Sequence, residues 1–237
     1  FEYLDDFRVG IGTSNFYEKI ETDASASRNM RRQEGDYWDS FANFSFDLDK
    51  RNQKFQTTDG YRSLYYLNVP FVSDTNTLKN TYNYKYFAEL YEENITTFSV
   101  YLSAANSLSN DNVKLSERLN VPSDKLRGFE FGKVGPKDGA DFIGGNYVST
   151  LNLSSTLPNF LENAQNTDFL FFIDAANIWG VDYDSSIDNS NQIRSSIGLG
   201  LDWFTPVGPL SFSISQPLTK AASDQTESFR FNLGTSF

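Results

Sequence analysis

The sequence contains no cysteine and no histidine, and it has a single methionine. Without cysteine, the chain has no disulfide framework, no thiolate nucleophile and no thiolate metal site. Without histidine, it lacks the commonest general base and the commonest metal ligand, and a Ser-His-Asp triad is excluded. We therefore expect no enzymatic activity, no catalytic residues, no metal site and no cofactor.

Basic residues are also scarce: 20 Lys and Arg stand against 31 Asp and Glu, which gives a net charge of −11. Proteins that bind nucleic-acid backbones cluster Lys and Arg, so we expect no nucleic-acid partner. No stretch approaches the roughly 18 consecutive apolar residues that a membrane helix needs. A membrane β-barrel has the same appearance as a soluble protein in this respect, because only alternate residues of its strands face lipid.

Aromatic residues are abundant, with 22 Phe, 13 Tyr and 3 Trp making up 16% of the chain. The lipid-facing surface and the interfacial girdles of a membrane barrel require such a content. The chain begins at Phe1 with neither an initiator Met nor a signal peptide, so we expect it to be a processed or truncated piece.

Apolar and polar residues alternate in ten segments, separated by clusters of Asn, Asp, Gly, Ser and Pro. This pattern is typical of an all-β meander. The segments are Phe7–Thr13, Ser40–Leu48, Tyr61–Val69, Thr81–Tyr91, Ile95–Ala104, Asn146–Leu157, Asp168–Trp179, Arg194–Phe204, Leu210–Pro217 and Ser228–Phe237.

The two faces of the later segments differ in a way that favours a barrel. In Leu210–Pro217 apolar residues alternate with serines, and in Arg194–Phe204 they alternate with Ser, Gly and Asp. The exposed face of a soluble sandwich usually carries Lys, Glu and Thr instead. A sandwich core remains an alternative for the apolar faces. We predict a transmembrane antiparallel β-barrel with apolar residues outward and small polar residues inward.

The connections between segments alternate in length, as they do in membrane barrels. One connection exceeds the roughly 12–15 residues beyond which a loop without secondary structure is usually functional or disordered; it spans Ser107–Gly145. The other long loops are Asn15–Asp36 and Gly180–Gln192, and the tighter turns lie near Asp49–Asn52, Asn159–Thr167 and Pro206–Pro209. The stretch that starts at Asp182 has the Asp spacing of a calcium loop but lacks its Gly and Glu, so we expect a solvated loop.

The longest loop contains "LRGFEFGKVGPKDG", which is followed in order by "GGN", "FFIDAANIW" and "GPLSFSISQPL…FRFNLGTSF". This series resembles the C-terminal part of the BamA-type outer-membrane assembly barrels, also called bacterial surface antigen barrels. The resemblance covers nearly the whole chain and is densest from Leu126 to Phe237. It implies a 16-stranded barrel preceded by periplasmic POTRA repeats, with residues 1–237 forming the last ten strands of one barrel domain. The repeats and the first strands would then lie upstream of Phe1.

The resemblance also implies a site inside the barrel. Arg127, Gly128 and Phe129 match an Arg-Gly-Phe/Tyr motif at the tip of a loop that folds into the lumen. Gly128 permits tight passage of the backbone, and an arginine in the lumen needs a carboxylate partner. By resemblance that partner is Asp174; an ordinary hydrated acid of the lumen is the alternative. Many relatives place a second acid on the preceding strand, where this chain offers Ser154.

The last segment alternates strictly, and its outward residues are Phe229, Phe231, Leu233 and Phe237. In the resembling family such an aromatic-ended strand is read as an insertion signal. Gly234 weakens the strand locally, so the seam between the last and first strands can open there. The alternative is that Gly234 makes room for a side chain in the lumen.

The function implied by the resemblance is that of a bacterial outer-membrane assembly factor, which folds and inserts other β-barrel proteins through a weak seam. The expected partners are the outer-membrane bilayer, unfolded outer-membrane protein clients, and accessory lipoproteins bound through the upstream repeats. The alternatives are a TamA-like or two-partner secretion transporter and a passive pore. We expect the 237-residue piece alone not to form a stable closed barrel, because two unpaired strand edges would face lipid.

Overall fold

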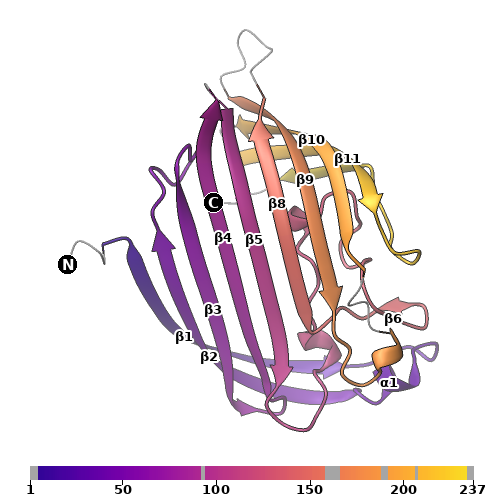
Figure 1. Ribbon diagram of the computed structural model, residues 1–237. Coiled ribbons are helices and arrows are strands. Elements are labelled where there is room, and N and C mark those ends of the chain that lie inside the picture. Colours follow the sequence, from indigo (N-terminus) through magenta and orange to yellow (C-terminus); the bar gives the residue numbers. More distant parts are fainter. Residues whose placement is uncertain (1–4, 92–93, 158–165, 188–191, 206–207, 234–237) are drawn as a thin grey trace.

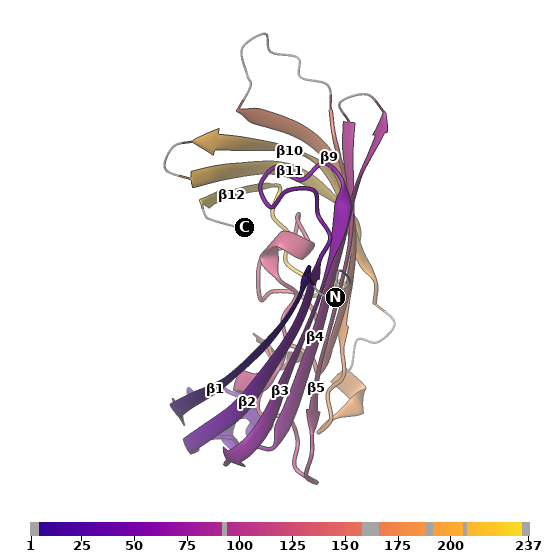
Figure 2. The same ribbon diagram turned by 90° about the vertical axis from the view of Figure 1, so that its left-hand side faces the viewer.

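The computed structural model describes residues 5–91, 94–157, 166–187, 192–205 and 208–233. Ten antiparallel strands form one sheet, which curves so that one face is concave (Figures 1 and 2). In sheet order the strands are β1 (Phe7–Ile20), β2 (Gly35–Asp49), β3 (Gly60–Ser73), β4 (Thr77–Tyr91), β5 (Asn94–Ser107), β8 (Tyr147–Thr156), β9 (Thr167–Trp179), β10 (Arg194–Thr205), β11 (Gly208–Thr219) and β12 (Phe229–Leu233).

Each strand pairs with its neighbours in the chain, and β5 pairs with β8 across the longest loop. Within the described residues, β1 and β12 are the two edges of the sheet. The remaining elements are short: α1 (Arg28–Arg31), η2 (Leu115–Glu117), η3 (Ser123–Lys125), the hairpin of β6 (Lys137–Asp138) and β7 (Asp141–Phe142), and η4 (Ser185–Ile187). The prediction of an all-β fold with ten strands is confirmed. Among the described helices, none has the length and apolar character required to cross a bilayer.

Side chains alternate across the sheet as the sequence predicts. On β10, Leu199 is 57% exposed whereas Ser196 is fully buried, and on β11 Ile214 is exposed between two buried serines. On β12, Phe229, Phe231 and Leu233 are exposed while Arg230 is buried. The apolar side chains therefore lie on the face turned away from the loops, where lipid would cover them.

The first two strands are longer than predicted. β1 continues to Ile20 and β2 begins at Gly35, so the expected loop Asn15–Asp36 shrinks to residues 21–34. The polar pair Ser14–Asn15 interrupted the apolar pattern, although it stays within the strand. Ser14 Oγ accepts a hydrogen bond from Asn43 Nδ2 at 3.1 Å, which shows how a polar side chain is satisfied there without ending the strand.

The predicted tight turn at Asp49–Asn52 is wrong, because residues 50–59 form a loop. Asn52 organises it: its Oδ1 accepts hydrogen bonds from the backbone N–H groups of Gln53, Thr58 and Asp59 at 2.9–3.3 Å. The connection from β3 to β4 has only residues 74–76, so loop length does not alternate strictly. Thr205 pairs with Gly208 where β10 meets β11; Pro206 and most of Asn159–Thr167 lie outside the described residues.

A glycine on β10 creates the space for a buried aromatic ring on β9. Gly198 lies directly opposite Phe172, whose side chain is fully buried on the concave face. A Cβ atom at Gly198 would collide with this ring and with the backbone carbonyl of Ile214. A Cβ at Gly12 on β1 would meet no atom within 4 Å.

We predict that Gly198→Ala destabilises the full-length protein by about 1–3 kcal/mol, because the Phe172 ring has to move. Gly12→Ala is the matched control and leaves stability nearly unchanged. The stability of both variants is measured by thermal unfolding in detergent, with the loss of the heat-modifiable folded band on gels as the readout. Equal melting temperatures for the two variants would contradict the packing described here.

Candidate functional site

The longest loop, residues 108–146, lies within the curve of the sheet and contacts strands along most of its width (Figure 2). Its sequence motif and the last hairpin of the chain meet on the concave face. We take the site to be this contact between the loop, β8–β9 and β12.

Arg127 and Asp174 form a bidentate ion pair. Arg127 Nε donates to Asp174 Oδ2 at 2.7 Å, and Nη2 donates to Oδ1 at 2.8 Å. The backbone N–H of Arg127 adds a bond to Oδ2 at 3.1 Å. Asp174 is fully buried, and the Arg127 guanidinium lies 3.4 Å from the centroid of the Phe172 ring. A planar guanidinium satisfies both oxygens of a buried carboxylate and stacks on an aromatic face in the same position.

Asn152 on β8, and not Ser154, is the residue opposite Asp174. The register pairs Asn152 with Asp174 and Ser154 with Phe172. Asn152 Nδ2 donates to Asp174 Oδ1 at 2.9 Å and to the backbone oxygen of Lys125 at 2.7 Å. The amide therefore joins the loop to both strands without adding a second negative charge. Ser154, the residue expected where relatives place a second acid, pairs with Phe172 and not with Asp174.

The backbone at Gly128 packs closely against small residues of β10 and β11. Its φ of +90° lies in the region that favours glycine. A Cβ there would stand 3.2 Å from Ser215 Oγ and 3.3 Å from the Cβ of Ser196, tighter than ordinary van der Waals contact. The serines on this face thus allow the loop backbone to approach the sheet.

Phe129 is 1% exposed and lies in an apolar cluster between the loop and the concave face. Small polar residues were predicted for the inward face, and an apolar cluster there was not. Its members are Val121, Leu126, Phe129, Val134, Val148, Ala176 and Ile178. Burial of these side chains supplies a driving force for docking the loop that is independent of charge.

The terminal strand holds the same loop through Arg230. This side chain is 8% exposed, pairs with Glu227, and donates to the backbone carbonyl oxygens of Ser123 and Phe129. Next to it, the backbone N–H of Glu227 donates to the Gly128 carbonyl at 3.1 Å. Sequence reasoning missed Arg230; the available signal was a single arginine on the inward face of an otherwise uncharged strand.

A second ion pair fixes the hairpin that precedes β12. Arg194 Nε donates to Asp224 Oδ2 at 2.9 Å, and both side chains are fully buried. Asp224 Oδ1 also accepts from the backbone N–H of Gly135 in the loop at 3.2 Å. The pair therefore joins β10, the last hairpin and the loop at one point.

The start of the loop is anchored at the far edge of the sheet. Lys114 Nζ lies 2.8 Å from Glu18 Oε2 on β1 and 3.2 Å from Asp39 Oδ2 on β2. Burial alone would lower the pKa of Lys114, but the hydrogen bonds to these two carboxylates raise it above its ordinary value.

Asp182 provides a further anchor for the loop. It pairs with Arg118 and accepts from the backbone N–H of Val113 at 2.6 Å. The expectation of a merely solvated loop is therefore wrong at Asp182.

Two residues singled out in the sequence, Gly234 and Phe237, lie outside the described residues. The other residues named for the terminal strand, Phe229, Phe231 and Leu233, are exposed on the convex face.

Comparison with known proteins identifies the family. Residues 3–237 match the Omp85 superfamily domain. The chain belongs to the Omp85 superfamily. A protein named outer membrane protein assembly factor BamA, from Neorickettsia risticii, is 24% identical over 240 residues, covering 98% of this chain and 32% of that protein. The BamA of Neisseria meningitidis serogroup B is 28% identical over 139 residues, covering 47% of this chain and 17% of that protein.

The crystal structure of BamA from Haemophilus ducreyi lacking POTRA domains 1–3 superposes with a TM-score of 0.82 at 22% identity, over 95% of this chain and 50% of that one. A SAM50-like protein of Schizosaccharomyces pombe is 27% identical over 148 residues, covering 60% of this chain and 31% of that protein. This Omp85 chain spans about a third of the length of the Neorickettsia relative. Its sheet is part of a bacterial outer-membrane β-barrel.

We predict that Asp174→Asn releases the loop. The substitution keeps the shape but leaves the Arg127 charge without its carboxylate, at a cost of about 3 kcal/mol in loop docking. Hydrogen exchange of the loop amides in the full-length protein should then speed up by about 100-fold. Ser154→Ala is the control on the neighbouring strand and should change exchange little. Unchanged protection in Asp174→Asn would show that the ion pair does not hold the loop.

Proposed function

We propose that this chain is part of an assembly factor that folds other β-barrel proteins and inserts them into the outer membrane. Its family and the names of its relatives support this proposal. The observation that carries it is the contact between the sequence motif and the terminal strand. Arg127 and Phe129 fix the loop to β9 and the apolar cluster, and Arg230 then fixes β12 to that loop.

An incoming strand has to pair its backbone before it meets lipid, because each unsatisfied N–H or C=O in hydrocarbon costs several kcal/mol. The edge of a sheet offers such pairing. Within the described residues, β12 pairs with β11 over Phe229–Leu233 and forms one edge of the sheet. An edge strand is paired on one side, so contacts with the rest of the protein help to hold it in place as a template. The docked loop performs this role from inside the barrel.

The clients in this proposal are unfolded outer-membrane proteins. Accessory lipoproteins bind through repeats upstream of the described strands, and Gly234 provides the weak point of the seam. The reaction uses no covalent chemistry and no nucleotide, since strand pairing and lipid burial of the client supply the free energy.

We predict that Arg230→Ala lowers the rate of client insertion by at least about tenfold, because two backbone carbonyls lose a charged donor and β12 is no longer held. The full-length protein is reconstituted in liposomes, a urea-unfolded client barrel is added, and its folded fraction is followed over time. Lys220→Ala is the matched control: it removes an exposed basic residue from the same hairpin.

Wild-type activity in Arg230→Ala, with the loop still docked, would contradict the role given to β12. A different result would overturn the proposed function itself. Liposomes that contain the wild-type protein, conduct ions and fail to speed client folding at all would point to a passive pore.

A further inference from the structure

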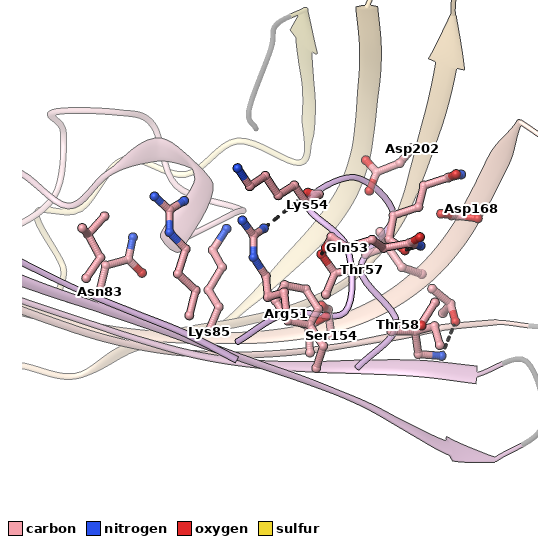
Figure 3. Close-up of a pocket in the computed structure, with 18 of the residues that line it drawn as sticks. Arg51, Gln53, Lys54, Thr57, Thr58, Asn83, Lys85, Ser154, Asp168 and Asp202 are labelled. Atoms are coloured by element: carbon pink, nitrogen blue, oxygen red, sulfur yellow. Dashed lines mark hydrogen bonds between the residues drawn. The ribbon is translucent and has the colours of Figure 1, made fainter. Parts of the chain in front are cut away.

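A pocket of about 970 Å³ lies on the concave face, near the strand ends that are joined by the 50–59 loop (Figure 3). Residues of β3, β4, β5, β8, β9 and β10 line it together with that loop. None of the residues that contact Arg127 lines this pocket. Its volume is in the range of small-molecule sites.

One side of the pocket carries Arg51, Arg62 and Lys85, and Lys54 of the loop lines the pocket as well. Arg51 holds Asp49 through two hydrogen bonds, Nε to Oδ1 at 2.8 Å and Nη2 to Oδ2 at 2.9 Å. Arg62 holds Asp47 in the same way, with both distances at 2.9 Å. Both guanidinium groups are thereby fixed in position, and each keeps an Nη1 group away from its carboxylate.

Lys85 is the third cation, and it lies directly opposite Arg62 in the β3–β4 register. Figure 3 shows Lys85 and Arg51 on the same side of the pocket. Within the described part of the chain, the Lys85 ammonium has no hydrogen bond and no ion pair. Like charges opposite one another destabilise a sheet, and a bound anion would relieve the repulsion between Arg62 and Lys85. Arg51 and Arg62 each pair with a carboxylate, whereas Lys85 does not.

The other side of the pocket is acidic. Asp168 on β9 and Asp202 on β10 face each other in register, and Figure 3 shows both across the pocket from Lys85. Asp202 Oδ1 accepts a hydrogen bond from Ser211 Oγ at 2.6 Å. The remaining carboxylate oxygens can accept hydrogen bonds from hydroxyl or amine groups.

The loop over the pocket is ordered before any ligand arrives. Asn52 fixes its backbone as described above, and Arg51 Nη1 donates to the Lys54 carbonyl at 3.3 Å. Phe55 packs edge-on against Phe204 of β10, with ring centroids 5.2 Å apart. The loop is thus held to both halves of the sheet, which keeps the binding groups in a fixed arrangement.

We propose that this pocket binds a phosphate group carried by a small polar ligand. The phosphate lies on Lys85, Arg62 and Arg51, and donor groups of the ligand contact Asp168 and Asp202. A phosphate presents three terminal oxygens to three cationic groups, whereas a carboxylate presents two. The phosphate supplies the negative charge that Lys85 lacks.

The test titrates the full-length protein in phosphate-free detergent with inorganic phosphate and with glycerol phosphate, and follows binding by calorimetry. We expect the wild type to bind both probes, and Lys85→Gln to weaken binding at least about tenfold through loss of a charged donor. Lys85→Arg restores the charge and should recover most of the affinity. Lys79→Gln is the matched control, because Lys79 lies on the same strand and face but already pairs with Glu117 at 3.6 Å.

Thermal unfolding provides a second readout. Phosphate should raise the melting temperature of the wild type and of Lys79→Gln but not that of Lys85→Gln, since a ligand stabilises only a protein that binds it. Absence of phosphate binding by the wild type, or equal binding by Lys85→Gln, would overturn the proposal.

A competition experiment identifies the source of the phosphate. Displacement of inorganic phosphate by micelle-dispersed phospholipid at lower concentrations than by glycerol phosphate assigns the site to a lipid headgroup. The reverse pattern assigns it to a soluble phosphate ester. Asp168→Asn should weaken glycerol phosphate and leave inorganic phosphate unaffected, because only the ester carries hydroxyl donors that reach the acidic side.

Discussion

A fully buried carboxylate sets the arrangement of the concave face. Asp174 has no contact with solvent, so its charge has to be met by donors inside the protein. Arg127 supplies two side-chain hydrogen bonds and Asn152 a third. Because Arg127 comes from a loop that starts at the end of β5, satisfying this one acid places 39 residues of chain, 108–146, against the inside of the sheet.

Once the loop is docked on the concave face, its other contacts depend on the room beside the sheet and on the backbone groups that need hydrogen-bond partners. Gly128 lies on Ser196 and Ser215, and Phe129 enters the apolar cluster. Arg230 of the terminal strand donates hydrogen bonds to two backbone carbonyl oxygens of the loop, those of Ser123 and Phe129. The loop consequently links β9, near the middle of the described sheet, to β12 at its edge. Lys114 extends the same connection to β1 and β2 at the opposite edge.

Alternation of apolar and polar residues was sufficient to predict the ten strands and the face that each presents to lipid. The pairing partner of Arg127 was available only through resemblance, since nothing in the spacing of Arg127 and Asp174 reveals that they meet. The role of Asn152 was not predictable either, because it depends on the register of β8 and β9, which places Asn152 opposite Asp174. Ser14 and Asn15 concealed the continuation of β1, because two consecutive polar residues look like the start of a loop.

Arg230 and Asp224, which the sequence did not single out, and Asp182, which was expected in a solvated loop, share one property. Each is a charged side chain whose partner is distant in the sequence and lies on the loop or in its neighbourhood. A local sequence pattern predicts that such a residue is solvated, because its partner comes close only when the loop is folded. The same limit applies to Lys85, for which the sequence offered no signal.

The central claim is that the docked loop holds the terminal strand in place. Hydrogen exchange of the β12 amides in full-length Arg127→Ala, compared with the wild type, tests it most directly. The account predicts that β12 loses protection together with the loop, although Arg127 does not touch β12. Full protection of β12 with an undocked loop would show that the strand is held by its neighbours alone and would contradict the claim.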